Sequence, residues 1–173
     1  MERVILARHG ESDRSVGGLT NGDPLVRVAL TATGREEARR LGRELADDPI
    51  DFCVTSEFER ARETADLALE GREVPRLVLA DLNDIRFGEF EGRLLTDYRA
   101  WAHAHGPEDV VPGGDESRAE TVARYVLEAI AGRDPAARIE YVPYAEPFRL
   151  DALELRQAVE RMSAWLERPT WHR

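Results

Sequence analysis

The sequence predicts a mixed α/β fold, because short apolar runs typical of strands alternate with stretches of helical spacing. The apolar runs are residues 4–7, 52–55 and 77–79, and all three contain β-branched side chains. Amphipathic stretches follow these first two runs, and an alternation of strand and helix is typical of α/β proteins. With 173 residues and 42% apolar content, the chain is expected to form a single domain over residues 1–173.

The first predicted helix covers residues 35–46. Its apolar positions have the i, i+3, i+4, i+7 spacing of a face that packs on a sheet: Ala38, Leu41, Gly42 and Leu45. Thr31 or Thr33 is expected to cap this helix, because a hydroxyl oxygen accepts hydrogen bonds from the unpaired N–H groups of the first turn. Residues 13–29, before the helix, are rich in Gly, Asp and Asn and are predicted to form a loop.

The second predicted helix follows the second strand. Ser56 and Glu59 have the spacing of a capping box, so Ser56 is expected to be the N-cap. The face expected to pack is formed by Phe58, Ala61, Ala65 and Leu69. Arg60 falls in the first turn, where the helix dipole and the guanidinium together favour a bound anion. The alternative for Arg60 is a surface residue that pairs with Glu57 or Glu63.

The rest of the chain predicts three helices and one strand. The helices are expected over residues 95–105, over residues 117–130, which open with a capping box, and over residues 151–166. A short strand is expected over residues 139–142. The loop at residues 81–92 carries four acidic side chains beyond the end of the third strand. One of these carboxyl groups is therefore a candidate proton donor.

Composition excludes several classes of partner. The net charge is −10 and the isoelectric point is near 5.0, so the field of the protein repels nucleic acids and acidic membranes. All 24 basic residues are arginine, which points to a bias in codon usage, so only arginines within a motif count as functional candidates.

Cys53 is the one cysteine in the sequence. A reduced, cytoplasmic location without a secretory signal is the resulting expectation.

The candidate site lies at the end of the first strand. Arg8, His9 and Gly10 combine a cation, a titratable imidazole and a glycine that permits close backbone approach. Ligands of open α/β sheets bind at the carboxyl ends of the strands. The alternative is a charged loop with a solvated histidine. His103 and His105 are two residues apart and diverge on a helix, so no metal site is expected.

Five motifs in order make the sequence similar to the histidine phosphatase superfamily, in its phosphoglycerate-mutase-like branch. The resemblance covers residues 3–130, and its specificity comes from the ordered set, since each motif alone is short. The motifs are Arg8-His9-Gly10-Glu11-Ser12; Leu30-Thr31 with Gly34 and Ala38; Ser56, Arg60, Ala61, Thr64 and Ala65; Phe87-Gly88 with Glu91-Gly92; and Pro112-Gly113-Gly114 with Glu116-Ser117.

The resemblance implies phosphoryl transfer without a cofactor or a metal. His9 is then the nucleophile that forms a phosphohistidine, and Arg8 and Arg60 bind the phosphoryl oxygens. Asp84 falls where the family places its general acid, often a glutamate. The ligand is a small-molecule phosphomonoester or inorganic phosphate. Residues expected to order the loop are Gly10, Glu11 and Ser12.

The family also implies a second histidine, which this sequence lacks. That histidine belongs to a Val-Val-x-His segment between a strand and a helix, whereas here the helix at residues 117–124 continues directly into residues 125–135. We hypothesise an internal deletion that removed the strand and its histidine. The expected fold is a three-layer α/β/α sandwich with a mostly parallel central sheet, one strand short. None of His103, His105 and His172 lies in a matching context.

Three functions follow from these observations. The retained His9, Arg8, Arg60 and Asp84 favour a phosphatase whose activity the missing histidine impairs. The missing segment favours a degenerate phosphate-binding or scaffold protein without turnover. A mutase of the phosphoglycerate-mutase type is the third alternative. The sequence identifies neither the substrate nor the oligomeric state.

Overall fold

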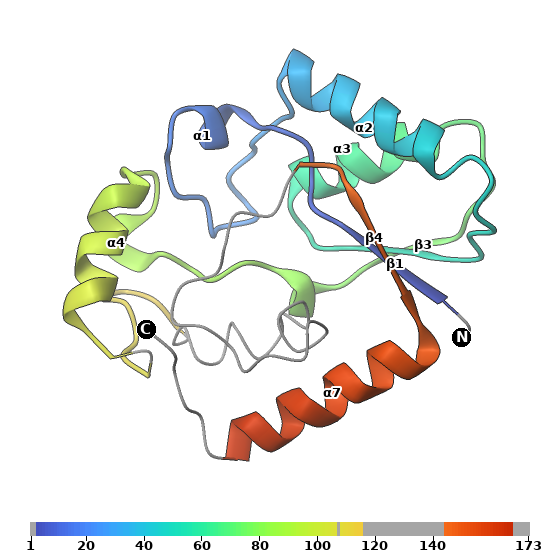
Figure 1. Cartoon of the computed structure of the whole chain (residues 1–173). Helices are drawn as coiled ribbons and strands as arrows, with labels where there is room; N and C mark the ends of the chain where they lie inside the picture. Colours follow the sequence, from blue (N-terminus) through green and yellow to red (C-terminus); the bar gives the residue numbers. More distant parts are fainter. Residues whose placement is uncertain (1–2, 107, 116–143, 168–173) are drawn as a thin grey trace.

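The computed structural model describes residues 3–106, 108–115 and 144–167, and these form the expected mixed α/β fold (Figure 1). The helix predicted at 117–130, the strand predicted at 139–142, the hypothesised deletion and His172 lie outside the described residues.

The described strands form two pairs. Strand β1 (Arg3–Ala7) pairs antiparallel with β4 (Pro147–Asp151), with Val4 opposite Leu150. Strand β2 (Cys53–Thr55) pairs parallel with β3 (Arg76–Val78). One antiparallel and one parallel pair are therefore present where a mostly parallel central sheet was expected, and the described residues do not confirm that sheet.

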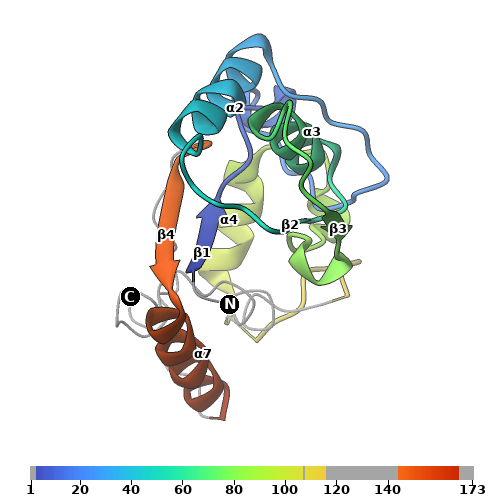
Figure 2. The ribbon, with the colours of Figure 1, turned by 90° about the vertical axis from the view of Figure 1, so that its right-hand side faces the viewer.

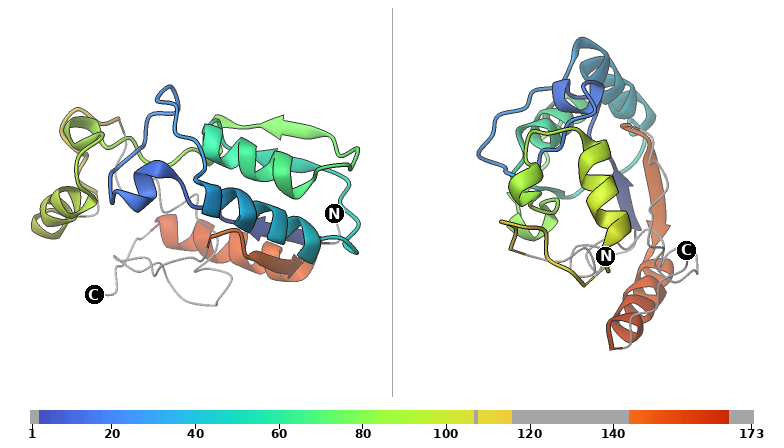
Figure 3. Two further views of the ribbon diagram at one scale, coloured as in Figure 1. Left: turned by 90° about the horizontal axis from the view of Figure 1, so that it is seen from above. Right: turned by 90° about the vertical axis from the view of Figure 1, so that its left-hand side faces the viewer.

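Helices lie on both sides of these strands. Helices α2 (Ala32–Glu44) and α3 (Glu59–Ala68) lie side by side on one side, and α7 (Ala152–Glu167) lies on the other (Figures 1 and 2; Figure 3, left). The two neighbouring helices approach closely, because a Cβ on Gly42 would lie 2.6 Å from the carbonyl oxygen of Ala68. Their inner faces bury one apolar cluster against the strands, formed by Leu41, Leu45, Ala68 and Ala145 with Ile5 and Ile50 packed against it.

A second apolar cluster lies around α4 (Leu95–Ala104), which confirms the helix expected at residues 95–105. Its buried members are Ile85, Phe87, Tyr98 and Val111. The rings of Phe87 and Tyr98 meet edge to face at 4.8 Å. The loop at residues 81–92 packs here, and two 3-10 turns, η1 (Ala80–Leu82) and η2 (Gly88–Phe90), interrupt it.

Three local expectations are wrong. The predicted loop at residues 13–29 begins with one helical turn, α1 (Asp13–Val16), because the hydroxyl of Ser12 accepts a hydrogen bond from the Ser15 N–H. The N-cap of α3 is Phe58, with no side-chain cap, whereas Ser56 was expected. The backbone of Phe58 is extended, with φ −61° and ψ 133°, and before it the Glu57 N–H donates to Asn83 Oδ1 at 3.0 Å. The third error is strand β4, which the sequence did not predict.

Of the two alternatives for the cap of α2, the structure has Thr31, whose hydroxyl accepts from the Gly34 N–H at 3.0 Å. Within the described ranges, no helix combines the length and the apolar character needed to cross a bilayer.

Candidate functional site

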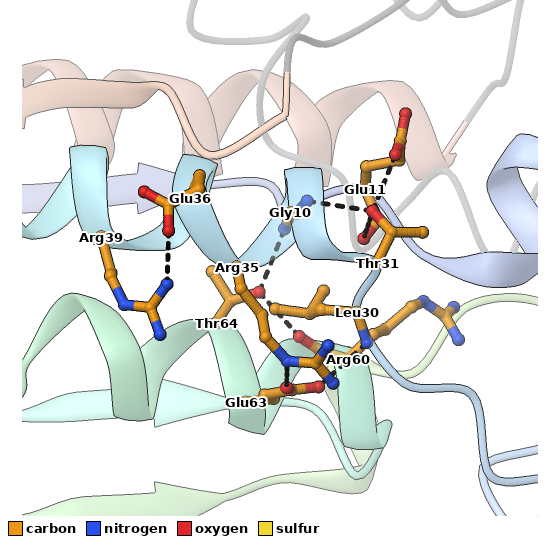
Figure 4. Close-up of polar contacts among 11 residues, drawn as sticks. Gly10, Glu11, Leu30, Thr31, Arg35, Glu36, Arg39, Arg60, Glu63 and Thr64 are labelled. Atoms are coloured by element: carbon orange, nitrogen blue, oxygen red, sulfur yellow. Dashed lines mark hydrogen bonds and ion pairs between the residues drawn. The ribbon is translucent and has the colours of Figure 1, made fainter.

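The segment after β1 is held by residues of α2 and α3. The Gly10 N–H donates to Thr64 Oγ1 at 3.0 Å, and the Thr64 hydroxyl donates to the Arg60 carbonyl at 2.7 Å (Figure 4). On its other side, Gly10 approaches α2 so closely that a Cβ would lie 2.4 Å from the Gly34 carbonyl oxygen. The fold therefore requires glycine at position 10, and it fixes the backbone that carries His9.

Hydrogen bonds define the tautomer of His9. Its Nδ1 lies 2.7 Å from the Gly10 carbonyl oxygen, which accepts only, so Nδ1 carries the proton. The opposite nitrogen, Nε2, then keeps its lone pair and accepts from Arg60 Nε at 3.0 Å. Burial, and then the charge of Arg60, lower the pKa of His9 from 6.5 to about 3, with Arg8 acting in the same direction and the Gly10 hydrogen bond opposing it. The imidazole is therefore neutral at ordinary pH.

Among the residues that the structure describes, Arg60 is the one charged residue that is buried, with 7% of its surface exposed. Its two terminal nitrogens both face Asn21: Nη1 donates to the side-chain oxygen, and Nη2 to the backbone carbonyl at 3.3 Å. The ring of Phe58 lies below the guanidinium, 3.9 Å from Cζ. Asn21 is itself 6% exposed. Arg60 thus lies where the sequence placed it, in the first turn of α3, and Asn21 orients it.

Two residues of the site, Asn21 and Tyr144, were not predicted from the sequence. The Asn-Gly pair at residues 21–22 is a turn signal, and nothing in it pointed to a buried partner for Arg60. The ring of Tyr144 lies 4.0 Å from Arg8 Cζ, and its centroid lies 5.9 Å from that of His9. No pattern around Tyr144 indicated this contact, because it depends on the unpredicted strand β4.

The two acidic residues considered as surface partners of Arg60, Glu57 and Glu63, accept hydrogen bonds from other residues. Glu63 accepts from Arg35 Nε at 2.6 Å and from the Leu30 N–H at 2.9 Å (Figure 4). Glu57 accepts from the side-chain amide of Asn83 at 2.7 Å. Glu63 thereby links α3 to the segment that precedes α2.

Asp84 lies in the wall of an open cavity of about 400 Å³. The residues around the cavity are Gly22, Glu57, Ala80, Asn83, Asp84, Arg86 and Asp115. Its carboxylate accepts from the Ile85 N–H at 2.8 Å. Gly22 directly follows Asn21, so the cavity adjoins the segment that orients Arg60. The structure thus brings Arg8, His9 and Arg60 together and places Asp84 beside the neighbouring cavity.

Glu11 and Ser12 make contacts that fix the loop. The Glu11 N–H donates to Glu37 Oε2 at 2.8 Å. Glu11 Oε1 accepts from the Thr31 hydroxyl at 2.7 Å (Figure 4). Ser12 is 2% exposed and caps α1. These contacts support the loop-ordering role expected of both residues, which stays a prediction.

Within the described part of the chain, no group of three or more His, Cys, Asp and Glu side chains is arranged to hold a metal ion. Of the other histidines, His103 and His105 are exposed at the end of α4, and His105 stacks on Trp101 at 4.5 Å.

At the end of the first strand of this α/β fold, a neutral imidazole accepts a hydrogen bond from a buried guanidinium of α3. This arrangement is typical of a protein that transfers phosphoryl groups through a histidine. The comparisons with known proteins agree. The chain belongs to the histidine phosphatase superfamily (branch 1), whose family model matches residues 4–142.

Relatives fall into two groups. The adenosylcobalamin/alpha-ribazole phosphatase of Salmonella typhimurium is 41% identical over 107 residues, which are 57% of this chain and 52% of that protein. The 2,3-bisphosphoglycerate-dependent phosphoglycerate mutase of Methylobacterium sp. is 40% identical over 153 residues, 77% of this chain and 70% of that protein. The chain thus spans about half the length of the phosphatase relatives that it matches.

Solved structures share the fold. An alpha-ribazole-5'-P phosphatase of Escherichia coli, described as putative, superposes with a TM-score of 0.62 at 29% identity, over 76% of this chain and 68% of that one. TTHB049 from Thermus thermophilus also superposes with a TM-score of 0.62, at 27% identity, over 87% of this chain and 94% of that one.

Proposed function

We propose that this protein is a phosphoryl-transfer enzyme that hydrolyses small-molecule phosphomonoesters through a phosphohistidine on His9. One observation carries the proposal. The Gly10 carbonyl fixes the proton on Nδ1, so Nε2 keeps its lone pair and faces the guanidinium of Arg60. A neutral imidazole is nucleophilic without a separate base.

In the first step, Nε2 of His9 attacks phosphorus and the bond from phosphorus to the alcohol oxygen breaks. Asp84, protonated, gives its proton to that oxygen, so the alcohol leaves neutral. In the second step, a water molecule attacks phosphorus, Asp84 takes the water proton, and the bond from phosphorus to Nε2 breaks. Inorganic phosphate leaves, and His9 returns to its starting state.

Arg60 has to change partner during the first step. Its Nε–H donates at 3.0 Å to the same lone pair that attacks phosphorus. A bound phosphoryl group offers oxygens to this N–H and so frees Nε2. The contacts of Nη1 and Nη2 with Asn21 keep the guanidinium near His9 while this happens. Arg60 and Arg8 then stabilise the charge on the phosphoryl oxygens in the transition state.

A phosphoglycerate mutase reaction is the second candidate. It is favoured by the longer alignment with the Methylobacterium mutase, which covers 70% of that protein against 52% of the Salmonella phosphatase. The two reactions share the phosphohistidine and differ in the acceptor, which is water in a phosphatase and a second phosphoglycerate hydroxyl in a mutase.

The experiment is the hydrolysis of p-nitrophenyl phosphate from mildly acidic to neutral pH. Wild-type protein is expected to release p-nitrophenol, His9→Gln to release none, and the control His105→Gln, which changes an exposed histidine, to match wild type. Phosphate exchange between the positions of a phosphoglycerate, without phosphate release, would establish the mutase instead. Folded wild-type protein that binds phosphate but shows neither reaction would overturn both and leave a phosphate-binding protein.

Two finer expectations stay part of the proposal. The three-layer α/β/α sandwich, with a mostly parallel sheet one strand short, is proposed for the whole chain, and it rests on the family resemblance. A cytoplasmic location is proposed from the single cysteine, Cys53.

A further inference from the structure

We infer that Tyr144 is a positioning residue that holds Arg8 in place for phosphate binding. The inference rests on the proposed function, in which Arg8 binds the phosphoryl group. The ring of Tyr144 lies 4.0 Å from the Cζ of Arg8, within the range of a cation–π contact. The same ring lies 5.9 Å from the ring of His9, inclined at 41°. One aromatic side chain therefore contacts both the proposed nucleophile and its neighbouring arginine.

Backbone contacts of Tyr144 and Ala145 with Arg8 place the Tyr144 ring beside the Arg8 side chain. Tyr144 forms a β-bridge with Arg8, and the Ala145 N–H donates to the Arg8 carbonyl at 3.0 Å. Two residues later the chain enters β4 and runs antiparallel to β1 (Figure 2). The change of direction passes through Ala145, whose φ is 47°, the one positive φ of a non-glycine residue in the described ranges.

A positive φ is unfavourable for alanine, and backbone strain of this kind collects at functional sites. The surroundings hold Ala145 in this conformation, because it is fully buried in the cluster with Leu41, Leu45 and Ala68. The core of the protein thus keeps the turn that places the Tyr144 ring against Arg8.

A cation–π contact suits a phosphate-binding arginine, because the ring takes no strong hydrogen bond from the guanidinium. The N–H groups of arginine point outward in the plane of the guanidinium, and they bind phosphate oxygens. The ring of Tyr144, which lies beneath Arg8 Cζ, limits rotation of the side chain and offers no oxygen on its face that would compete with phosphate. Tyr144 also covers His9, and burial is the largest cause of the lowered pKa of that imidazole.

The test is a double-mutant cycle on the affinity for inorganic phosphate, measured by isothermal titration calorimetry. The variants are Tyr144→Leu and Tyr144→Phe, each in the wild-type and in the Arg8→Met background. Phe148→Leu is the matched control, because it removes a ring from β4 at an exposed position opposite Leu6. Tyr144→Leu is expected to weaken phosphate binding by about 2- to 30-fold, the range that corresponds to a cation–π contact.

Tyr144→Phe and Phe148→Leu are expected to bind like wild type, and Tyr144→Leu is expected to have no further effect once Arg8 is replaced. An equal effect of Tyr144→Leu in both backgrounds, or a Tyr144→Phe variant as weak as Tyr144→Leu, would overturn the inference. If Tyr144→Leu does not fold, the NMR shifts of the Arg8 side-chain protons decide. A ring-current shift of these protons in wild type and in Tyr144→Phe supports the contact between Tyr144 and Arg8. The absence of this shift from wild type overturns the inference.

Failure of this inference and failure of the proposed function give different results. A phosphatase with normal phosphate affinity in Tyr144→Leu retains the function and loses the inference. A protein without turnover whose phosphate affinity follows the expected pattern loses the enzymatic function and retains Tyr144 as the residue that positions Arg8.

Discussion

Acidification tests the electrostatics of His9. The pKa of this residue is about 3 in the folded protein and 6.5 in the unfolded chain, so the unfolded chain binds one more proton between these values. The folded state consequently loses stability as the pH falls from 6.5 towards 3, and it gains nothing from His9 above that window. Between pH 7.5 and pH 4.5, the loss attributable to His9 is about 2–3 kcal/mol, from about 1.4 kcal/mol per unit of pKa difference.

The assay is urea unfolding of wild type and of His9→Gln at both pH values. Glutamine does not titrate, so the extra loss in wild type isolates His9. The Asp48 carboxyl, whose pKa Arg149 holds below its usual value, also destabilises the protein in acid, but it does so equally in both chains and cancels. Equal losses in the two proteins, or an NMR titration of the His9 ring near pH 6.5, would refute a partly buried imidazole beside two arginines.

Two further predictions concern the loop and the general acid. Gly34→Ala is expected to destabilise the protein by about 1–3 kcal/mol, because the new Cβ would lie 2.0 Å from the Glu11 carbonyl oxygen. Urea unfolding measures this, with Gly17→Ala, whose new Cβ would meet its nearest neighbour at 3.4 Å, as control; a stabilised Gly34→Ala protein would contradict the packing. Asp84→Asn is expected to lower kcat/KM by about 10²- to 10⁴-fold on alkyl phosphates, whose leaving oxygen needs a proton, and by less on p-nitrophenyl phosphate, whose leaving group does not. An equal loss of kcat/KM on both substrates would contradict the role of Asp84 as proton donor to the leaving group.

Local signals in the sequence predicted the secondary structure that carries Arg8, His9 and Arg60. The apolar run before Arg8 and His9 indicated a strand end, and the helical spacing around Arg60 indicated a first turn. Both features depend on neighbouring residues in the chain, and hydrophobic periodicity reports such neighbours well. The cap at Thr31 was one of two local alternatives, and the hydrogen bond to Gly34 decided between them.

Contacts between segments that are distant in the chain could not be predicted from the sequence. Strand β4 is a short run that alternates apolar and charged residues. It forms by pairing with β1, and no local pattern in the sequence indicates that pairing. Tyr144 reaches Arg8 only because of that pairing. Ser56 failed as a cap because Asn83, 26 positions along the chain from Glu57, binds the Glu57 backbone in front of α3. In that case a tertiary contact overrode a valid local preference, whereas for β4 the sequence carried no local signal.

The most direct test of the central claim is a search for phosphate on His9 during turnover. Protein mixed with a phosphomonoester is quenched in alkali, in which phosphohistidine survives, and is then examined by mass spectrometry and ³¹P NMR. We expect one phosphoryl group on His9 bonded to Nε2, because Nδ1 is occupied by its hydrogen bond to the Gly10 carbonyl. Turnover without phosphohistidine, or phosphate bonded to Nδ1, would contradict the proposed mechanism.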